Sequence, residues 1–144
     1  MTSPFTLTRQ VEFNHCDPAG IVFYPRYFEM ISALTERFFS DALGHSWESM
    51  LLTDGALGTP LGAIEARFRA PSRLGDTLTL TLLVERIGTS SVDFAITCTC
   101  AGQTRFTCHA TVVHASTANG RAAPWPGDLR TQLERFQTAP EMTE

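Results

Sequence analysis

The stretch YPRYFEMISALTERFFSDAL, residues 24–43, decides the fold. Its apolar side chains return every three or four residues, so they share one face of an α-helix. They are Tyr27, Met30, Ile31, Leu34, Phe38 and Ala42. Pro25 suits the first helical turn, where its missing N–H costs nothing, and Gly44 suits the position after the last turn. The pattern predicts one long helix, roughly Tyr24 to Leu43, with a single apolar face to bury.

The segments around this helix alternate between apolar and polar residues, which is typical of half-buried β-strands. One such segment, Phe5–Phe13, precedes the helix. Four follow it, with apolar rows at Ile64–Ala70, Leu78–Val84, Val92–Cys100 and Phe106–Val112. Shorter helical patterns lie at Trp47–Leu52 and Leu129–Phe136. Short connections favour antiparallel hairpins. These patterns together predict an α+β domain, in which a five-stranded antiparallel sheet packs on one long central helix.

The composition is that of an ordinary globular protein, with 144 residues, of which 43% are hydrophobic and 18% charged. The length predicts one domain, 1–144, with residues 138–144 as a frayed tail. A net charge of −4 gives no support for nucleic-acid binding. No apolar run approaches the ~20 residues of a membrane helix, and no signal-peptide pattern is visible. We therefore expect a cytoplasmic protein without a membrane partner, whose four cysteines are free thiols.

The chemistry is expected in the turn between the first strand and the long helix. Asp17 lies there, and Gly20 lets the backbone approach a ligand closely. The helix start at Phe23 and Tyr24 offers backbone N–H groups without partners and a partial positive charge. Thioester hydrolysis requires a carboxylate that attacks the acyl carbon or activates water, and N–H donors that stabilise the oxyanion. An Asp-Pro pair is also common in ordinary turns, however.

Ten residues of this segment form a specific motif: Cys16, Asp17, Pro18, Ala19, Gly20, Ile21, Val22, Tyr24, Pro25 and Tyr27. The motif resembles the signature of the 4-hydroxybenzoyl-CoA thioesterase family, a group with the hotdog fold. The order of strands and helix is similar along nearly the whole chain. The resemblance implies a hotdog fold and an enzyme that hydrolyses the thioester of an acyl-CoA without a metal or another cofactor.

The resemblance also implies roles for particular residues. Asp17 is expected to be the catalytic carboxylate, and the backbone N–H of Tyr24 to polarise the thioester carbonyl. Hotdog dimers build the site at their interface, so Gly58, Thr59 and Pro60 of a second subunit are expected to line the acyl pocket. A sheet with an uncovered edge also favours pairing with a second copy. The expected assembly is a homodimer or a homotetramer.

Two further groups of residues are expected to contact the substrate. The segment Arg86-Ile-Gly-Thr-Ser-Ser91 matches the part of the family that meets the nucleotide of CoA. It keeps Arg86 and Ser90 but lacks several basic residues that the hydroxybenzoyl enzyme carries there. Aromatic residues gather at the helix start, where Gly20 and Phe23 are expected to lie beside the substrate. The motif and these rings favour an aromatic acyl group over a long aliphatic one.

Other interpretations of the same residues are weaker. His15, Cys16 and Asp17 are adjacent in the chain, whereas the members of a catalytic triad converge from separate segments. Cys98, Cys100, Cys108 and His114 lie on the apolar sides of their strands, which favours core packing over a metal site. Glu65 could be a second catalytic carboxylate, but pairing with a nearby arginine is expected instead. Alternative functions are hydrolysis of acyl carrier protein thioesters and acyl-CoA binding without catalysis.

Overall fold

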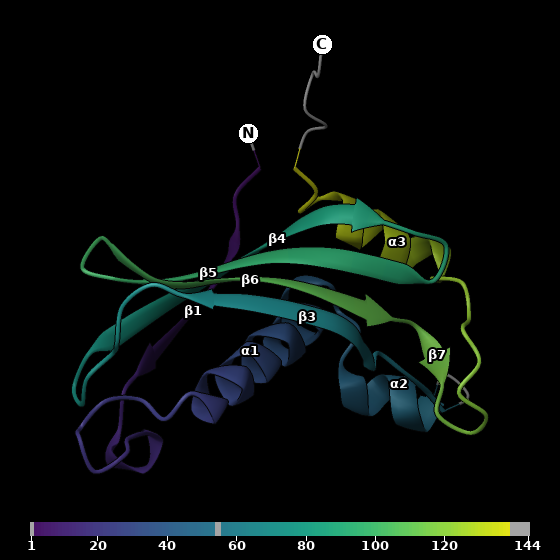
Figure 1. Ribbon diagram of the computed structural model, residues 1–144. Coiled ribbons are helices and arrows are strands. Elements are labelled where there is room, and N and C mark those ends of the chain that lie inside the picture. Colours follow the sequence, from purple (N-terminus) through teal and green to yellow (C-terminus); the bar gives the residue numbers. More distant parts are fainter. Residues whose placement is uncertain (1, 54–55, 139–144) are drawn as a thin grey trace.

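The computed structural model describes residues 2–53 and 56–138. Its main feature is a five-stranded antiparallel sheet in the order β1-β4-β5-β6-β3. The strands are β1 (Phe5–Gln10), β3 (Leu61–Phe68), β4 (Thr77–Ile87), β5 (Ser91–Cys100) and β6 (Gln103–Val113). The sheet curves over the long helix α1 (Pro25–Arg37), which crosses its inner face (Figure 1). The predicted architecture is confirmed.

Smaller elements flank this frame. They are the 3₁₀ helix η1 (Phe13–His15), the π-helical turn η2 (Phe38–Ala42), α2 (Trp47–Thr53), β2 (Leu57–Gly58), β7 (Ala115–Ser116) and α3 (Gly127–Glu134). The two shorter helices predicted from the sequence are thus present as α2 and α3. The short strands β2 and β7 pair with each other, next to α2 (Figure 1). None of the described helices is long and apolar enough to cross a membrane.

The predicted long helix continues through η2 to Leu43, but its last turn is wider than an α-helical turn. The N–H of Leu43 donates to the carbonyl of Phe38, five residues earlier. Two adjacent phenylalanines, Phe38 and Phe39, are both completely buried there. Neighbouring residues of an α-helix point about 100° apart, and we attribute the wider turn to the burial of both rings. Phe38 packs edge-on against Phe94 and Phe136.

The core lies between α1 and the inner face of the sheet. The apolar rows predicted on the second, third and fourth of the later strands face it, and their members are almost completely buried. These are Leu78, Leu80, Leu82, Val84, Val92, Phe94, Ile96, Cys98, Phe106, Cys108, Ala110 and Val112. The alternation in the sequence is therefore the alternation between the core face and the outer face of the sheet.

Two local predictions were wrong. The first strand ends at Gln10, and Phe13, expected on its buried side, is 83% exposed in η1. The chain leaves the sheet at Val11, whose N–H and carbonyl bond to the backbone of Asp76 and Gly75. In addition, β3 and β4 do not form a hairpin. β3 pairs with β6, and residues 69–76 cross to the other side of β5 and β6 to reach β4.

The edge strand β3 is the part of the sheet that the chain covers least. Its apolar side chains Leu61, Ile64 and Phe68 are 55%, 36% and 48% exposed. The strand pairs only on its β6 side, so its other edge is unpaired within the described residues.

Near the C-terminal end of the sequence, the N–H of Thr138 donates to the carbonyl of Val84, although Thr138 was predicted to lie in the frayed tail. The rest of that tail, residues 139–144, lies outside the described residues.

Candidate active site

Asp17 lies in a small hairpin, residues 16–22, that leads from η1 to α1. Cys16 and Val22 pair across it, and the N–H of Asp17 donates to the carbonyl of Ile21. Gly20 completes the tight turn with φ of +78°, a conformation that other residues adopt only with strain. We call this segment the Asp17 hairpin. Its position is therefore set by backbone hydrogen bonds and by one glycine.

The two carboxylate oxygens of Asp17 have different surroundings. Oδ1 accepts hydrogen bonds from the N–H groups of Ala19, at 2.9 Å, and of Ile21, at 3.4 Å. No hydrogen bond reaches Oδ2 from any described residue. The side chain is half-buried and borders a hollow of about 390 Å³, together with Phe13 and Leu74. One oxygen orients the carboxylate and the other is available to a ligand.

The start of α1 follows directly and offers one free donor. The N–H of Phe23 donates a hydrogen bond to the carbonyl of His15, which links the helix start to η1. Within the described residues, the N–H of Tyr24 has no acceptor. Pro25 occupies the first helical position. The side chains of Phe23 and Tyr24 are about half exposed and contact each other edge-on. Tyr27, in contrast, is buried and stacks on Phe68, so its role in the core is confirmed.

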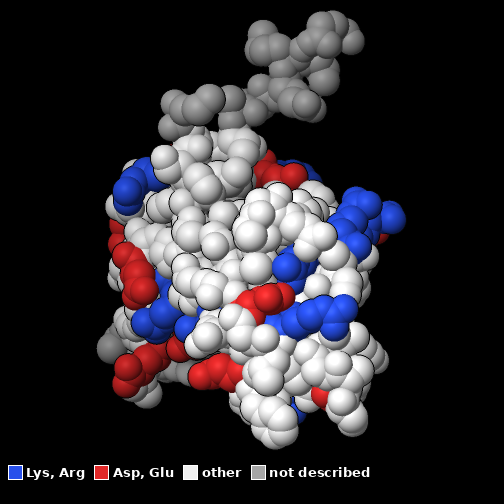
Figure 2. Space-filling model, turned by 90° about the vertical axis from the view of Figure 1, so that its left-hand side faces the viewer, with Lys and Arg blue, Asp and Glu red and all other residues white. Residues whose placement is uncertain are grey.

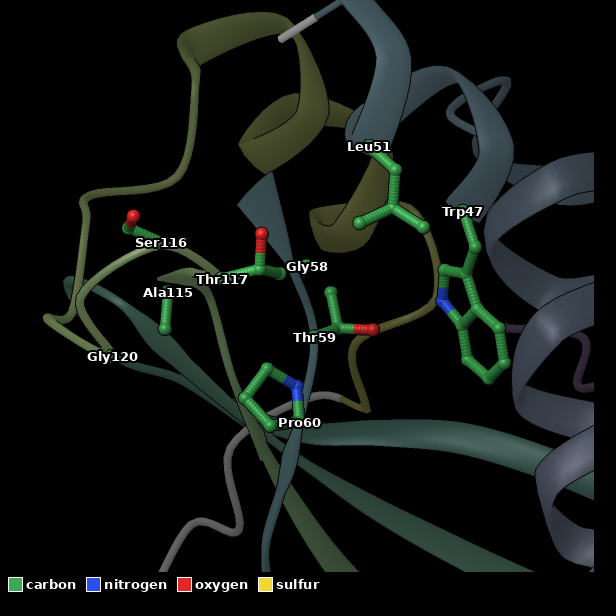
Figure 3. A pocket seen from close by; sticks show the side chains of 9 residues that line it. All are labelled: Trp47, Leu51, Gly58, Thr59, Pro60, Ala115, Ser116, Thr117 and Gly120. Atoms are coloured by element: carbon green, nitrogen blue, oxygen red, sulfur yellow. The ribbon is translucent and has the colours of Figure 1, made fainter. Parts of the chain in front are cut away.

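The residues expected to line the acyl pocket lie elsewhere. Gly58, Thr59 and Pro60 form one wall of a pocket of about 500 Å³, with α2 and the β7 segment as the other walls (Figure 3). Among the described residues, no charged side chain borders this pocket. A side chain at position 58 would approach the Thr117 methyl group to 3.2 Å, which explains why a glycine suits the wall.

Two polar atoms in this pocket are buried without a hydrogen-bond partner: Nε1 of Trp47 and Oγ1 of Thr59. Figure 3 shows the Thr59 hydroxyl pointing toward the Trp47 side of the pocket. Both residues also border a second, smaller hollow of about 200 Å³ between α1 and β3. An unpaired buried polar group is costly, so these two atoms are the ones in this region whose hydrogen bonds the described residues do not supply.

The two halves of the predicted site lie far apart in one chain. The Asp17 hairpin and the start of α1 are at one end of the molecule, whereas α2, β2 and β7 are at the other (Figure 1). Asp17 and Gly20 border one hollow, whereas Tyr24 borders a neighbouring one with Tyr27 and Phe68. Gly58, Thr59 and Pro60 are grouped separately. A single chain therefore does not bring all the predicted site residues together.

The segment from Arg86 to Ser91 spans the end of β4, a turn at residues 88–90 and the first residue of β5. The turn is anchored to the residue after β6, since the carbonyl of Ser90 accepts a hydrogen bond from the His114 N–H. The side chain of Arg130 donates to the carbonyl of Gly88. Arg86 is exposed and Ser90 is half-buried. Neither of them borders the hollow beside Asp17 or the pocket beside Thr59.

Charge is mixed around the end of the molecule that carries the Asp17 hairpin. Figure 2 shows basic and acidic side chains interspersed on this face, with a broad uncharged area between them. Glu65 is exposed and lies 3.6 Å from Arg67, so the expectation that it pairs with an arginine is confirmed. The described residues contain no group of three or more potential metal ligands.

A family model described as the thioesterase-like superfamily matches residues 11–133. The chain belongs to this superfamily. The 4-hydroxybenzoyl-CoA thioesterase of Pseudomonas sp. (strain CBS-3) is 31% identical over 80 residues, which cover 56% of this chain and 57% of that protein. The match thus spans little more than half of the relative's length. The resemblance noted from the motif is confirmed.

Solved structures extend the similarity to almost the whole chain. The structure of the Pseudomonas enzyme matches with a TM-score of 0.79 and 26% identity, and covers 90% of this chain and 98% of its own. A 1,4-dihydroxy-2-naphthoyl-CoA thioesterase from Synechocystis matches with a TM-score of 0.81 and 22% identity, over 91% and 96% of the two chains. The hotdog fold is therefore confirmed for this member of the thioesterase-like superfamily.

Sequence reasoning missed part of the pocket. Trp47 was predicted only as a helical residue, and Ala115 and Ser116 of β7 and the adjacent Thr117 were not singled out. The sequence gives little reason to select them, because small and β-branched residues after a strand are not typical of catalytic or binding motifs. The pairing of β2 with β7 brings them to the pocket, and a pairing between such short strands is not visible in periodicity.

The cysteines give a direct test of the core assignment. Burial raises the pKa of Cys98 to about 12 and that of Cys108 to about 11. At pH 8, roughly one in a thousand or fewer of these thiols is ionised, and only the thiolate reacts. We expect iodoacetamide to leave Cys98 and Cys108 unmodified in the native protein and to modify them after unfolding, as measured by peptide mass spectrometry. Fast native modification of either would contradict the packing.

Proposed function

We propose that this protein is an acyl-CoA thioesterase with Asp17 as its catalytic carboxylate. The observation that carries the proposal is the asymmetry of the Asp17 side chain. One oxygen is fixed by two backbone N–H groups, and the other has no partner among the described residues. The free N–H of Tyr24 begins the helix that follows the hairpin. The proposed carboxylate and the proposed oxyanion donor therefore belong to the same short segment, which leads from the Asp17 hairpin into α1.

In the proposed reaction, the thioester carbonyl oxygen accepts a hydrogen bond from the N–H of Tyr24. The positive end of the α1 dipole adds to this stabilisation as the oxyanion develops. Asp17 Oδ2 then either attacks the acyl carbon or removes a proton from an attacking water. Attack gives a mixed anhydride and the CoA thiolate, and water hydrolyses the anhydride. Both routes yield a carboxylic acid and CoA.

A second copy of the chain would complete the site. Tyr27, near the start of α1, stacks on Phe68 at the end of β3, whereas Pro60 directly precedes the start of β3. If the exposed β3 edges of two chains pair antiparallel, the start of one strand lies next to the end of the other. Thr59 of the partner subunit would then lie beside the start of α1. The same pairing would cover Leu61 and Ile64.

The pocket supports an aromatic acyl group. None of the described residues on its walls is charged, and the indole of Trp47 offers a flat surface. The free Nε1 of Trp47 and Oγ1 of Thr59 would suit a neutral oxygen substituent on the ring, such as a hydroxyl. The Pseudomonas and Synechocystis relatives are named for hydroxylated aromatic acyl groups. In this proposal, CoA extends from the pocket toward solvent.

The first test removes the charge of Asp17. Asp17→Asn should lower kcat by roughly a thousandfold or more with little change in substrate binding, because it removes a nucleophile or base and preserves the shape. Asp41→Asn, an exposed residue of η2, is the control and should behave as wild type. Single-turnover reactions in ¹⁸O water, followed by mass spectrometry of Asp17, separate direct attack from base catalysis. An Asp17→Asn enzyme within tenfold of wild type would exclude the role.

The second test concerns the acyl group. Hydrolysis rates should favour benzoyl-, hydroxybenzoyl- and phenylacetyl-CoA over butyryl-, octanoyl- and palmitoyl-CoA. Ring contacts contribute ~0.5–1.5 kcal/mol per pair beyond burial, which corresponds to about two- to tenfold in kcat/KM. Thr59→Val should reduce the rate for hydroxybenzoyl-CoA more than for benzoyl-CoA. If one aliphatic thioester exceeds all the aromatic ones by tenfold, the aromatic assignment fails and the thioesterase proposal remains.

The third test concerns the assembly. Sedimentation should give at least a dimer for the wild type, because the β3 edge and its apolar side chains are uncovered in one chain. Ile64→Glu places a charge on the exposed apolar row and should shift the protein toward monomers with a matching loss of activity. Ala63→Glu, on the opposite face of the same strand, is the control. A fully active monomer would refute the shared site.

A further inference from the structure

The crossover connection between β3 and β4, residues 69–76, is hydrogen-bonded to Arg105 of β6. Its Nη1 donates to the carbonyl of Pro71, at 3.0 Å, and to Oδ2 of Asp76, at 2.7 Å. Its backbone carbonyl accepts from the N–H groups of Arg69 and Ala70. We call residues 69–76 the crossover loop. Arg105 thus contacts both ends of that loop.

A β-bulge gives Arg105 this position. On β5, Cys98 pairs with Phe106 and Thr99 pairs with Thr104, so Arg105 is left without a partner on that strand. A bulge of this kind turns a side chain away from the regular alternation. The Arg105 side chain is only 11% exposed, and that of Asp76 is 28% exposed. Among the described residues, no other ion pair is so well shielded from water.

The crossover loop in turn holds the Asp17 hairpin. The N–H of Val22 donates to the carbonyl of Ser72, and the N–H of Leu74 donates to the carbonyl of Gly20. Ile21 and Arg73 form a β-bridge between the same two segments. The Arg105 side chain is therefore linked to the turn that orients the Asp17 carboxylate. The link consists of hydrogen bonds from Arg105 to the crossover loop, the backbone of that loop, and hydrogen bonds from the loop to the hairpin.

The ion pair is strengthened from both sides. The backbone N–H of Arg73 and the guanidinium of Arg105 lower the pKa of Asp76, so its carboxylate stays ionised at neutral pH. The hydrogen bond to Asp76 raises the pKa of Arg105. A shielded pair with a second hydrogen bond to a carbonyl fixes geometry better than an exposed pair does.

We propose that Arg105, through its contacts with Pro71 and Asp76, is a positioning residue that fixes the crossover loop and thereby the orientation of Asp17. This inference rests on the proposed catalytic role of Asp17. Arg105 itself does not touch the substrate or the reacting atoms. Its effect is on the geometry of the carboxylate, and small displacements of a catalytic group can cost about a hundredfold in rate.

Hydrogen exchange tests the structural part without reference to activity. In Arg105→Gln, the amides of Val22 and Leu74 should exchange faster than in wild type. Both amides donate hydrogen bonds between the crossover loop and the Asp17 hairpin, and these bonds should open more often when the loop is no longer held by Arg105. Arg105→Lys keeps a cation and should restore much of the protection. Leu133→Ala lies in α3, at the other end of the sheet, and controls for general destabilisation. Unchanged protection of both amides in Arg105→Gln would overturn the proposal.

Kinetics test the link to Asp17. Arg105→Gln should lower kcat by about ten- to a hundredfold with little change in KM, and Asp76→Asn should do the same. The double variant should be no worse than either single one, since both break one contact. Arg37→Gln removes an exposed ion pair with Asp41 and should leave kcat unchanged. The proposal would also be overturned if the fall in kcat of Arg105→Gln were fully accounted for by a smaller fraction of folded protein.

The same measurements separate this inference from the proposed function. If wild type hydrolyses no acyl-CoA of the panel, the thioesterase proposal fails and the exchange comparison still tests whether Arg105 fixes the hairpin. If wild type is active, Asp17→Asn is inactive, and Arg105→Gln keeps the full wild-type kcat, the positioning role alone is refuted.

Discussion

The packing of α1 and η2 against the inner face of the sheet is the interaction on which the rest of the structure depends. The apolar rows of β4, β5 and β6 and the apolar stripe of the helix form one core, to which Trp125, Leu129 and Leu133 also belong. Each completely buried large side chain contributes about 1.5–3 kcal/mol relative to exposure. Because Phe38 and Phe39 anchor one end of the helix in this core, the opposite end must project beside the Asp17 hairpin.

The same packing leaves the molecule incomplete. The helix covers β3 only in part, so Leu61, Ile64 and Phe68 of this edge strand remain partly exposed. The two groups of residues that the resemblance associates with thioester chemistry also lie at opposite ends of one chain. The proposed antiparallel pairing of β3 strands would account for both features. In the proposed dimer, burial of the apolar edge and completion of the site are the same event.

The sequence predicted the elements whose pattern depends on local periodicity. The stripe from Tyr27 to Ala42 and the alternation in the later strands each correspond to one helix or strand, because burial of one face imposes that period. The order of pairing was less accessible. Whether residues 69–76 form a hairpin or a crossover is decided by distant partners, among them Arg105, and not by their own composition. The prediction that Phe13 lies on the buried side of the first strand was wrong for a similar reason. Val11 bonds to the backbone of the crossover loop instead of continuing the strand.

The site shows the same division between local and distant information. Asp17, Gly20 and Tyr24 were predicted as site residues because a short motif contains them all. Arg105 could not be predicted in this way, since it lies 88 positions beyond Asp17 in the chain and its neighbours in sequence resemble any strand. A bulge, which depends on the register with β5, gives its side chain a new direction. Trp47 stands out only because its Nε1 is buried without a partner among the described residues, a property that no sequence pattern records.

The two interpretations of Asp17, as an ordinary turn residue and as a catalytic carboxylate, are compatible. Its Oδ1 accepts from two N–H groups of its own hairpin, as a turn aspartate does. A carboxylate held only by solvent would rotate freely, and an attacking oxygen must instead keep a fixed direction. The turn contacts supply that direction and leave Oδ2 without a partner in the described part of the chain. Since the hairpin is itself bonded to the crossover loop, the orientation of the oxygen that we propose to react would depend on contacts that reach as far as β6.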